Sequence, residues 1–184
     1  MTNLKKTLLN LCKKKVNKGI IRTYIDSDKS VLLDLFEEFG QFLVDIDDMS
    51  RSIKAPGYAA HVVQRTLEDV KNKNGVIYVY EMDEGIVGFI AGTIGDSSQD
   101  PDLKYYCVPT IYGVITELYI KPGHRGESIG SKLMAKMEQY FLDNKCDVSH
   151  VEVFGPNNKA QDFYKNKGYH TRSLDMIKKL RNNF

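Results

Sequence analysis

The chain has 184 residues, 42% of them hydrophobic and 27% charged, a composition that fits one soluble domain with a proper core. Its net charge of +2 argues against wholesale nucleic-acid binding, and no apolar run reaches the ~20 residues that span a bilayer. Cys12, Cys107 and Cys146 form no CxxC pair, which favours a reducing compartment and predicts a cytoplasmic location. The histidines show no ligand spacing, so no metal site is expected.

Residues 1–18 predict a basic N-terminal extension ahead of a single domain, residues 19–184. Seven Lys or Arg and no acid fall within residues 1–22, which makes the rest of the chain mildly acidic. Leu4, Leu8 and Leu11 stand at helical spacing, so a membrane-surface helix is one interpretation. Because there is no long apolar region or cleavage site, a solvated extension is favoured.

Hydrophobic periodicity then predicts the elements of the first half of the domain. Asp26 or Ser27 caps the first helix, and Asp83-Glu84-Gly85 joins the second and third strands as a hairpin. Residues 95–110 form a loop that is too long for a simple connection, so this loop is a candidate substrate-binding segment. In chain order the elements are strand 20–26, helices to about 44 and from about 58 to 73, strands 76–82 and 86–94, and loop 95–110.

Residues 115–141 read as a strand, a tight basic turn and an amphipathic helix, in that order. The helix is expected to begin near Ser128, since apolar residues then recur every fourth position as far as Phe141. Arg125, Gly126 and Gly130 lie at its start, where free N–H groups and the helix dipole favour an anion. An ordinary strand-to-helix connection, with the glycines serving turn geometry, is the alternative.

The remaining pattern predicts a strand at 148–154, a helix capped by Asn157 or Asn158 and ended by Gly168, and a last strand at 169–178. The element order is therefore β-α-α-β-β-β-α-β-α-β. This order predicts an α+β fold with mixed α/β layers around one sheet.

Two motifs and this element order resemble the Gcn5-related N-acetyltransferase (GNAT) superfamily. Residues 125–130, RGESIG, match the family's acetyl-CoA signature, and residues 157–164, NNKAQDFY, followed by Lys167-Gly168-Tyr169, match its second motif. The resemblance covers nearly the whole chain from Ile20 onward. It implies a central, mostly antiparallel sheet flanked by helices.

The resemblance also implies acetyl-CoA as co-substrate. Ser128 stands where the signature usually has glycine, and we expect an ordinary φ there, with the hydroxyl adding a phosphate hydrogen bond. The cofactor-binding residues implied are Leu118, Tyr119 and Ile120 for the pantetheine arm, Arg125, Gly126, Glu127, Ser128, Ile129, Gly130 and Ser131 for the pyrophosphate, and Asn157 and Tyr164.

The implied reaction is acetyl transfer from the thioester to a primary amine by direct attack. Tyr164 matches the family's general acid, with a satisfied core tyrosine as its alternative. Glu117 is the candidate base, directly or through water, and an ordinary ion pair is its alternative. Tyr119 lies on the same strand face as Glu117 and is a second candidate for the acceptor pocket.

The acceptor is expected to be a small-molecule amine, and acidic loop residues are candidates to attract it. The alternatives are a protein acetyltransferase, acting on lysine or an N-terminus, and a non-catalytic acyl-CoA-binding module. A homodimer is expected by the resemblance. Residues 126–130 also fit the G-x-S-x-G of a serine hydrolase, but residues 122–125 separate the serine from its strand. The acidic loop residues that are candidates to attract the amine are Asp45, Asp47, Asp48, Asp96, Asp100 and Asp102.

Overall fold

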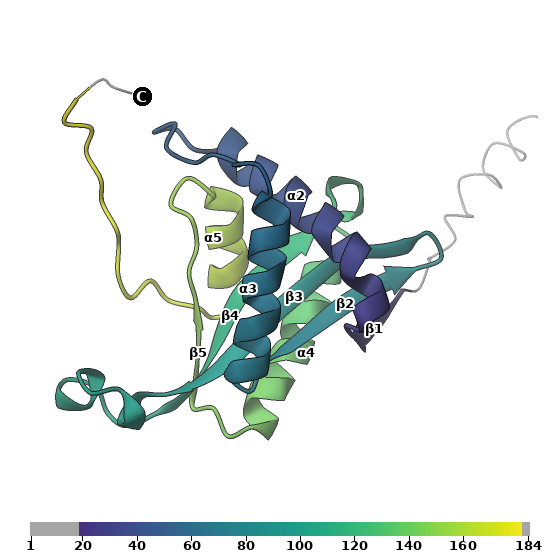
Figure 1. The fold of residues 1–184 in the computed structure, drawn as a ribbon. Coiled ribbons are helices and arrows are strands. Elements are labelled where there is room, and N and C mark those ends of the chain that lie inside the picture. The colour runs from purple at the N-terminus through teal and green to yellow at the C-terminus, as the bar shows by residue number, and fades with distance from the viewer. Residues whose placement is uncertain (1–18, 182–184) are drawn as a thin grey trace, which may run out of the picture.

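A computed structural model describes residues 19–181 and shows one sheet with helices on both faces (Figure 1). The predicted basic extension, residues 1–18, lies outside the described residues, so the division into extension and single domain stays a prediction. Within the described part, no helix combines the length and the apolar composition that crossing a membrane requires.

The sheet has five strands that neighbour one another in chain order. The first four are antiparallel and the last pair is parallel, which confirms the expected mostly antiparallel sheet. The predicted hairpin is present as β2 and β3. The strands are β1 (Ile20–Thr23), β2 (Val76–Met82), β3 (Gly85–Asp96), β4 (Ile111–Ile120) and β5 (Val148–Val151).

Helices α2 (Lys29–Asp45) and α3 (Tyr58–Asn72) cover one face of the sheet, and α4 (Ile129–Asp143) covers the other (Figure 1). The short α5 (Asn158–Lys165) packs on the α4 side through Phe163 and Tyr164. Short 3-10 helices are η1 (Asp26–Asp28), η2 (Ser97–Gln99), η3 (Leu103–Tyr105) and η4 (Pro122–His124).

Each face has its own apolar core. Leu133, Met137 and Phe141 of α4 are buried at the four-residue spacing predicted for them. Phe141 lies so close to β4 that a Cβ added to Gly113 would come within 2.4 Å of its ring, so only glycine fits there. On the opposite face Phe36 stacks on Phe89, with ring centroids 4.8 Å apart.

A bulge in β4 shifts the side-chain alternation at Thr116. Ala91 pairs with Glu117 and Gly92 with Ile115, so Thr116 is the extra residue. Ile115 therefore packs in the α4 core, whereas Glu117 and Tyr119 face α2 and α3. The bulge is what brings an acidic side chain to the α3 side of the strand.

β4 and β5 separate soon after they pair. Their ladder ends where Ile115 meets Val151, earlier than the strand predicted to reach residue 154. Among the described residues no strand pairs with the β5 side of residues 116–120. Peptide groups on that edge are therefore available to a ligand.

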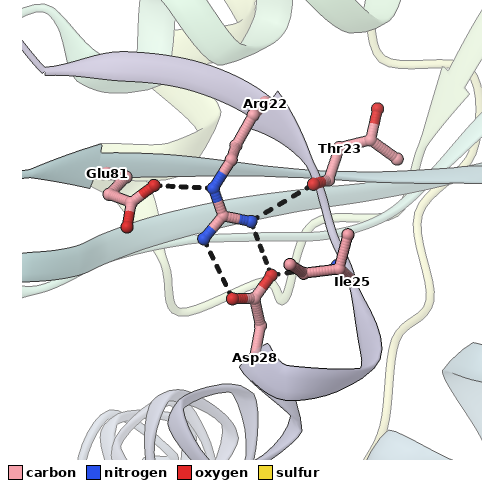
Figure 2. A network of polar contacts seen from close by, with 5 residues as sticks. All are labelled: Arg22, Thr23, Ile25, Asp28 and Glu81. Atoms are coloured by element: carbon pink, nitrogen blue, oxygen red, sulfur yellow. Dashed lines mark hydrogen bonds and ion pairs between the residues drawn. The ribbon is translucent and has the colours of Figure 1, made fainter.

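Arg22 fastens the first strand to the rest of the sheet (Figure 2). Its guanidinium donates to both oxygens of Asp28, at 2.6 and 2.9 Å, and its Nε donates to Glu81 Oε2 at 2.6 Å. Asp28 also accepts the Ile25 N–H at 2.9 Å. The network joins β1, η1 and β2, and these partners hold the pKa of Asp28 below its ordinary value.

The predicted last strand, 169–178, does not form. The chain leaves the sheet after β5, and among the described residues none pairs as a strand with residues 169–178. Leu174 and Met176 remain 79% and 88% exposed. Their alternating pattern resembles a strand, but a strand also needs a neighbour for its N–H and C=O groups, and none lies beside this segment.

Candidate active site

A cleft of about 500 Å³ opens where β4, the α4 N-terminus and α5 meet. Its walls contain nearly all the residues predicted to hold a cofactor, although they come from two motifs more than twenty residues apart. Those in the lining are Leu118, Tyr119, Ile120, Arg125, Gly126, Ser128, Ile129, Gly130, Ser131, Asn157 and Tyr164.

The α4 N-terminus faces this cleft without a cap. Ser128 is the N-cap residue, yet its hydroxyl makes no capping hydrogen bond, and the first helical bond recorded is from Lys132 N to Ser128 O. The N–H groups of Ile129, Gly130 and Ser131 therefore lack partners within the helix. Together with the helix dipole, these N–H groups have the properties that an anion requires.

The expectation of an ordinary φ at Ser128 is wrong. Ser128 has φ 61° and ψ 14°, in the left-handed region, and Gly126 has φ 85°. The chain must turn sharply between η4 and α4, and two left-handed residues so close together accomplish that turn. This alternation directs successive N–H groups toward one side, a geometry that suits an anion. Glycine would adopt it without strain, whereas serine carries about 1 kcal/mol.

Arg125 is held at the cleft by backbone and aromatic contacts. Its Nε donates to the Ile120 carbonyl at 3.0 Å, and its guanidinium lies 5.0 Å from the Phe42 ring centroid and 5.6 Å from that of Tyr119. These contacts fix a full positive charge beside the uncapped helix start. A positive charge, the helix dipole and free N–H groups thus lie together where the sequence predicts an anion site, and the site itself stays a prediction.

Tyr164 is a buried phenol in the cleft wall. It is 8% exposed, and its ring packs against Phe163 and Tyr169. Burial raises its pKa above the ordinary value of 10, so the hydroxyl stays protonated at neutral pH. Within the described residues no hydrogen bond is recorded to this hydroxyl, which leaves it able to donate to a ligand.

Asn157 begins α5 as predicted, since its side chain accepts the Ala160 N–H at 3.1 Å. Gly168, with φ 88°, follows the helix in the left-handed conformation typical of a C-terminal glycine. Both ends of the second motif therefore match their predicted structural roles.

Glu117 lies outside the cleft, in a neighbouring cavity of about 210 Å³. Its carboxylate is 9% exposed, and Arg65 Nη2 is 3.6 Å from its Oε1. Burial raises its pKa above the ordinary value of 4.5, and the nearby Thr116 hydroxyl and the Arg65 charge offset this shift only in part. Glu117 lines the cavity and Leu118, the next residue of β4, lines the cleft, so the candidate base and the candidate cofactor site lie along the same strand.

Among the predicted cofactor-binding residues, Glu127 is the one whose side chain does not line the cleft. It is exposed, with its carboxylate 4.0 Å from His124 Nδ1, and it is absent from the lining. Sequence reasoning in turn missed Phe39, Phe42, His124, Lys159 and Phe163, which do line the cleft. Of these, Lys159 carried a signal, as a cation in the first turn of a motif helix. Phe39 and Phe42 reach the site only through tertiary packing.

Several acidic loop residues have local structural roles. Asp47 accepts N–H bonds from Met49, Arg51 and Ser52. The Ser52 side chain and these N–H groups lower its pKa to about 2. Asp96 and Asp100 likewise accept N–H groups of their own loop. None of residues 95–110 lines the cleft or the cavity, because this loop adjoins the opposite end of β4.

Comparison with known proteins identifies the family. A family model described as "Acetyltransferase (GNAT) family" matches residues 42–169. The chain belongs to this family, whose members are acyltransferases that use acetyl-CoA as co-substrate.

Two sequence relatives are N-acetyltransferases. A thialysine N-epsilon-acetyltransferase of Sus scrofa is 39% identical over 69 residues, 36% of this chain and 41% of the relative. An uncharacterized N-acetyltransferase of Archaeoglobus fulgidus is 34% identical over 96 residues, 51% of this chain and 58% of the relative. The chain thus spans about half the length of the curated relatives it matches.

Solved structures share the fold. An acetyltransferase of the GNAT family from Staphylococcus aureus Mu50 superimposes with a TM-score of 0.63 at 18% identity, covering 82% of this chain and 84% of the other. The mixed α/β arrangement of this chain is therefore the family's fold.

Proposed function

We propose that this protein is an N-acetyltransferase that moves an acetyl group from acetyl-CoA to a primary amine. The observation that carries the proposal is the convergence of three features in one cleft. These are the uncapped α4 N-terminus beside Arg125, the unpaired edge of β4 and the buried phenol of Tyr164.

The cleft residues fit acetyl-CoA. The N–H groups from Gly126 to Ser131, with the Arg125 guanidinium, suit a pyrophosphate. The free edge at Leu118–Ile120 suits the amides of the pantetheine arm, and an N–H group there can polarise the thioester carbonyl. Asn157 lines the same cleft and would contact the arm. Glu127 contributes at most its backbone, since its side chain lies outside the cleft.

Two side chains carry the proton transfers. Glu117, directly or through water, accepts a proton from the incoming amine, whose nitrogen must be neutral to attack the thioester. A C–N bond forms, the C–S bond breaks, and the Tyr164 hydroxyl donates a proton to the departing thiolate. Burial supports both roles because it raises both pKa values.

A small-molecule amine is the proposed acceptor. The Sus scrofa relative is named for acetylating the ε-nitrogen of thialysine, which supports this choice. A protein acetyltransferase acting on lysine or an N-terminus is the second candidate. A non-catalytic acyl-CoA-binding module is the third, and the buried acid and phenol beside the cleft argue against it.

An acceptor panel tests the proposal. Purified protein is mixed with acetyl-CoA and each of a set of small amines, peptides with free lysine, and peptides with free N-termini, and acetylated products are identified by mass spectrometry. Acetylation of small amines above the peptides is the expected result. Acetyl-CoA binding without any acetylated product would favour the binding module.

A further inference from the structure

The cavity beside Glu117 contains two buried polar atoms that have no partner. Glu117 Oε2 and Thr66 Oγ1 both lack a hydrogen bond among the described residues, and their residues are 9% and 3% exposed. Both residues line the same 210 Å³ cavity. Native proteins rarely leave such atoms unsatisfied, so the two together indicate a site for a polar guest.

Size and position favour an amine as that guest. The cavity far exceeds the ~10–15 Å³ that one water molecule requires. It lies against the strand edge next to Leu118, where the cleft begins. A carboxylate accepts hydrogen bonds and a hydroxyl can accept or donate, so an amine nitrogen can satisfy both atoms.

Arg65 adds a positive charge to the same cavity and forms a long ion pair with Glu117. The cavity wall also contains Asp69 and the exposed Glu152. Arg65 Nη2 is 3.6 Å from Glu117 Oε1, too far for a hydrogen bond, and the Arg65 side chain is 56% exposed. Asp69, the neighbouring acid on α3, is already paired with Lys73 at 2.7 Å. The N–H groups of the Arg65 guanidinium can therefore donate two parallel hydrogen bonds to a carboxylate on the bound ligand.

We propose that this cavity is the acceptor subsite, and that it takes a primary amine carrying a carboxylate, as an amino acid with a side-chain amine does. The amine nitrogen lies between Glu117 and Thr66, and the carboxylate meets Arg65. This inference rests on the proposed function and specifies its acceptor.

The test compares two amines that differ by one carboxylate, L-lysine and 1,5-diaminopentane. Wild-type protein should have the higher kcat/KM for lysine. Arg65→Met should lower kcat/KM for lysine by about 10- to 100-fold, mainly through KM, because it removes a hydrogen-bonded charge pair. The same variant should lower kcat/KM for diaminopentane clearly less than for lysine, because diaminopentane loses only the effect of Arg65 on Glu117 and no carboxylate contact. Lys71→Met, an exposed cation on the same helix, is the matched control and should alter neither.

Thr66→Val tests the other end of the subsite. It removes the hydroxyl at nearly constant volume, so KM should rise for both amines. If the hydroxyl is only an unsatisfied structural group, the valine protein will instead be more stable with unchanged KM, which overturns this part of the inference.

The subsite and the proposed function fail in different ways. Equal losses for both amines in Arg65→Met, or acetylation confined to amines without a carboxylate, would overturn the subsite and leave the acetyltransferase standing. If no amine is acetylated, calorimetry with lysine and CoA decides. Lysine binding that Arg65→Met abolishes would retain the subsite without the reaction, and no binding to wild type would overturn it.

Discussion

Ser128 has a strained backbone conformation at a position where that conformation helps to build the candidate anion site. The position needs a left-handed conformation to turn the chain into α4, and serine adopts it at a cost of about 1 kcal/mol. Its hydroxyl makes no capping bond that offsets this cost. Such strain next to free N–H groups is typical of ligand sites.

Replacing Ser128 with glycine should therefore not destabilise the free protein. Relief of strain outweighs the extra chain entropy of glycine, so the free energy of unfolding should rise by about 0.5 kcal/mol. Ser131→Gly is the matched control, because Ser131 has helical backbone in α4 and its change should cost about 0.5 kcal/mol. Urea unfolding without ligand measures both, and a loss in both variants would contradict the strain argument.

The buried Glu117 carboxylate should lower the free energy of unfolding at neutral pH, although it is the proposed base of the reaction. Its folded-state pKa is raised, so the stability that it contributes is present below its ordinary pKa of 4.5 and lost as pH rises through the folded pKa. Glu117→Gln should thus be more stable than wild type at pH 7, with the difference vanishing below pH 4.5. Its turnover should fall by about 10²- to 10⁴-fold.

Unfolding curves from pH 4 to 8 and steady-state kinetics check this pair of effects. A variant that is less stable at every pH would show that Arg65 compensates the buried carboxylate fully. Unchanged turnover would remove Glu117 from the reaction and leave it as an ion-pair partner.

At the scale of elements, the Arg22 network is the clearest point of stabilisation outside the apolar cores. Asp28 is buried and bound to Arg22 through both oxygens, whereas Glu81 is more exposed. The network ties the four-residue β1 to its neighbours, and so short an edge strand gains little from its own ladder.

Asp28→Asn should lower the free energy of unfolding by about 2 kcal/mol at pH 7, since it leaves a partly buried guanidinium short of a partner. The folded-state pKa of Asp28 is lowered from 3.8, so this stabilisation is full above pH 3.8 and lost as pH falls through the folded pKa. The exposed neighbour Asp26 provides the control, because Asp26→Asn should change stability by less than about 0.5 kcal/mol. Equal effects at these two positions would contradict the network's role.

The hydrophobic pattern of the sequence predicted helices and strands well where the buried positions and the turn residues indicate the same bounds. β2 was predicted to the residue, and α4 begins at Ile129, one residue after the start expected near Ser128. The bulge at Thr116 and the φ of Ser128 were not predictable, because the partner strand and the closure of the turn determine them. The prediction of a last strand is wrong for the same reason, because alternating apolar residues in the sequence do not show whether another strand lies beside the segment.

Over the whole molecule, β4 is the element that joins the parts of the site. Its last residues form a wall of the cleft, and its middle residues form a wall of the cavity. The two motifs predicted the cofactor wall because their residues are close in sequence. The proposed acceptor subsite lies between α3 and the bulged β4, and only the tertiary structure brings these two elements together. The expected homodimer stays a prediction, which sedimentation velocity would test.

The most direct test of the central claim is amine-dependent release of the CoA thiol by wild type and Tyr164→Phe, with acetyl-CoA affinity measured in parallel. We predict that wild type releases thiol only when an amine is present. The phenylalanine variant should bind acetyl-CoA within about threefold of wild type but turn over about 10²-fold or more slowly, since only the proton donor is lost. Equal turnover by the two proteins, or no amine-dependent release by wild type, would contradict the claim.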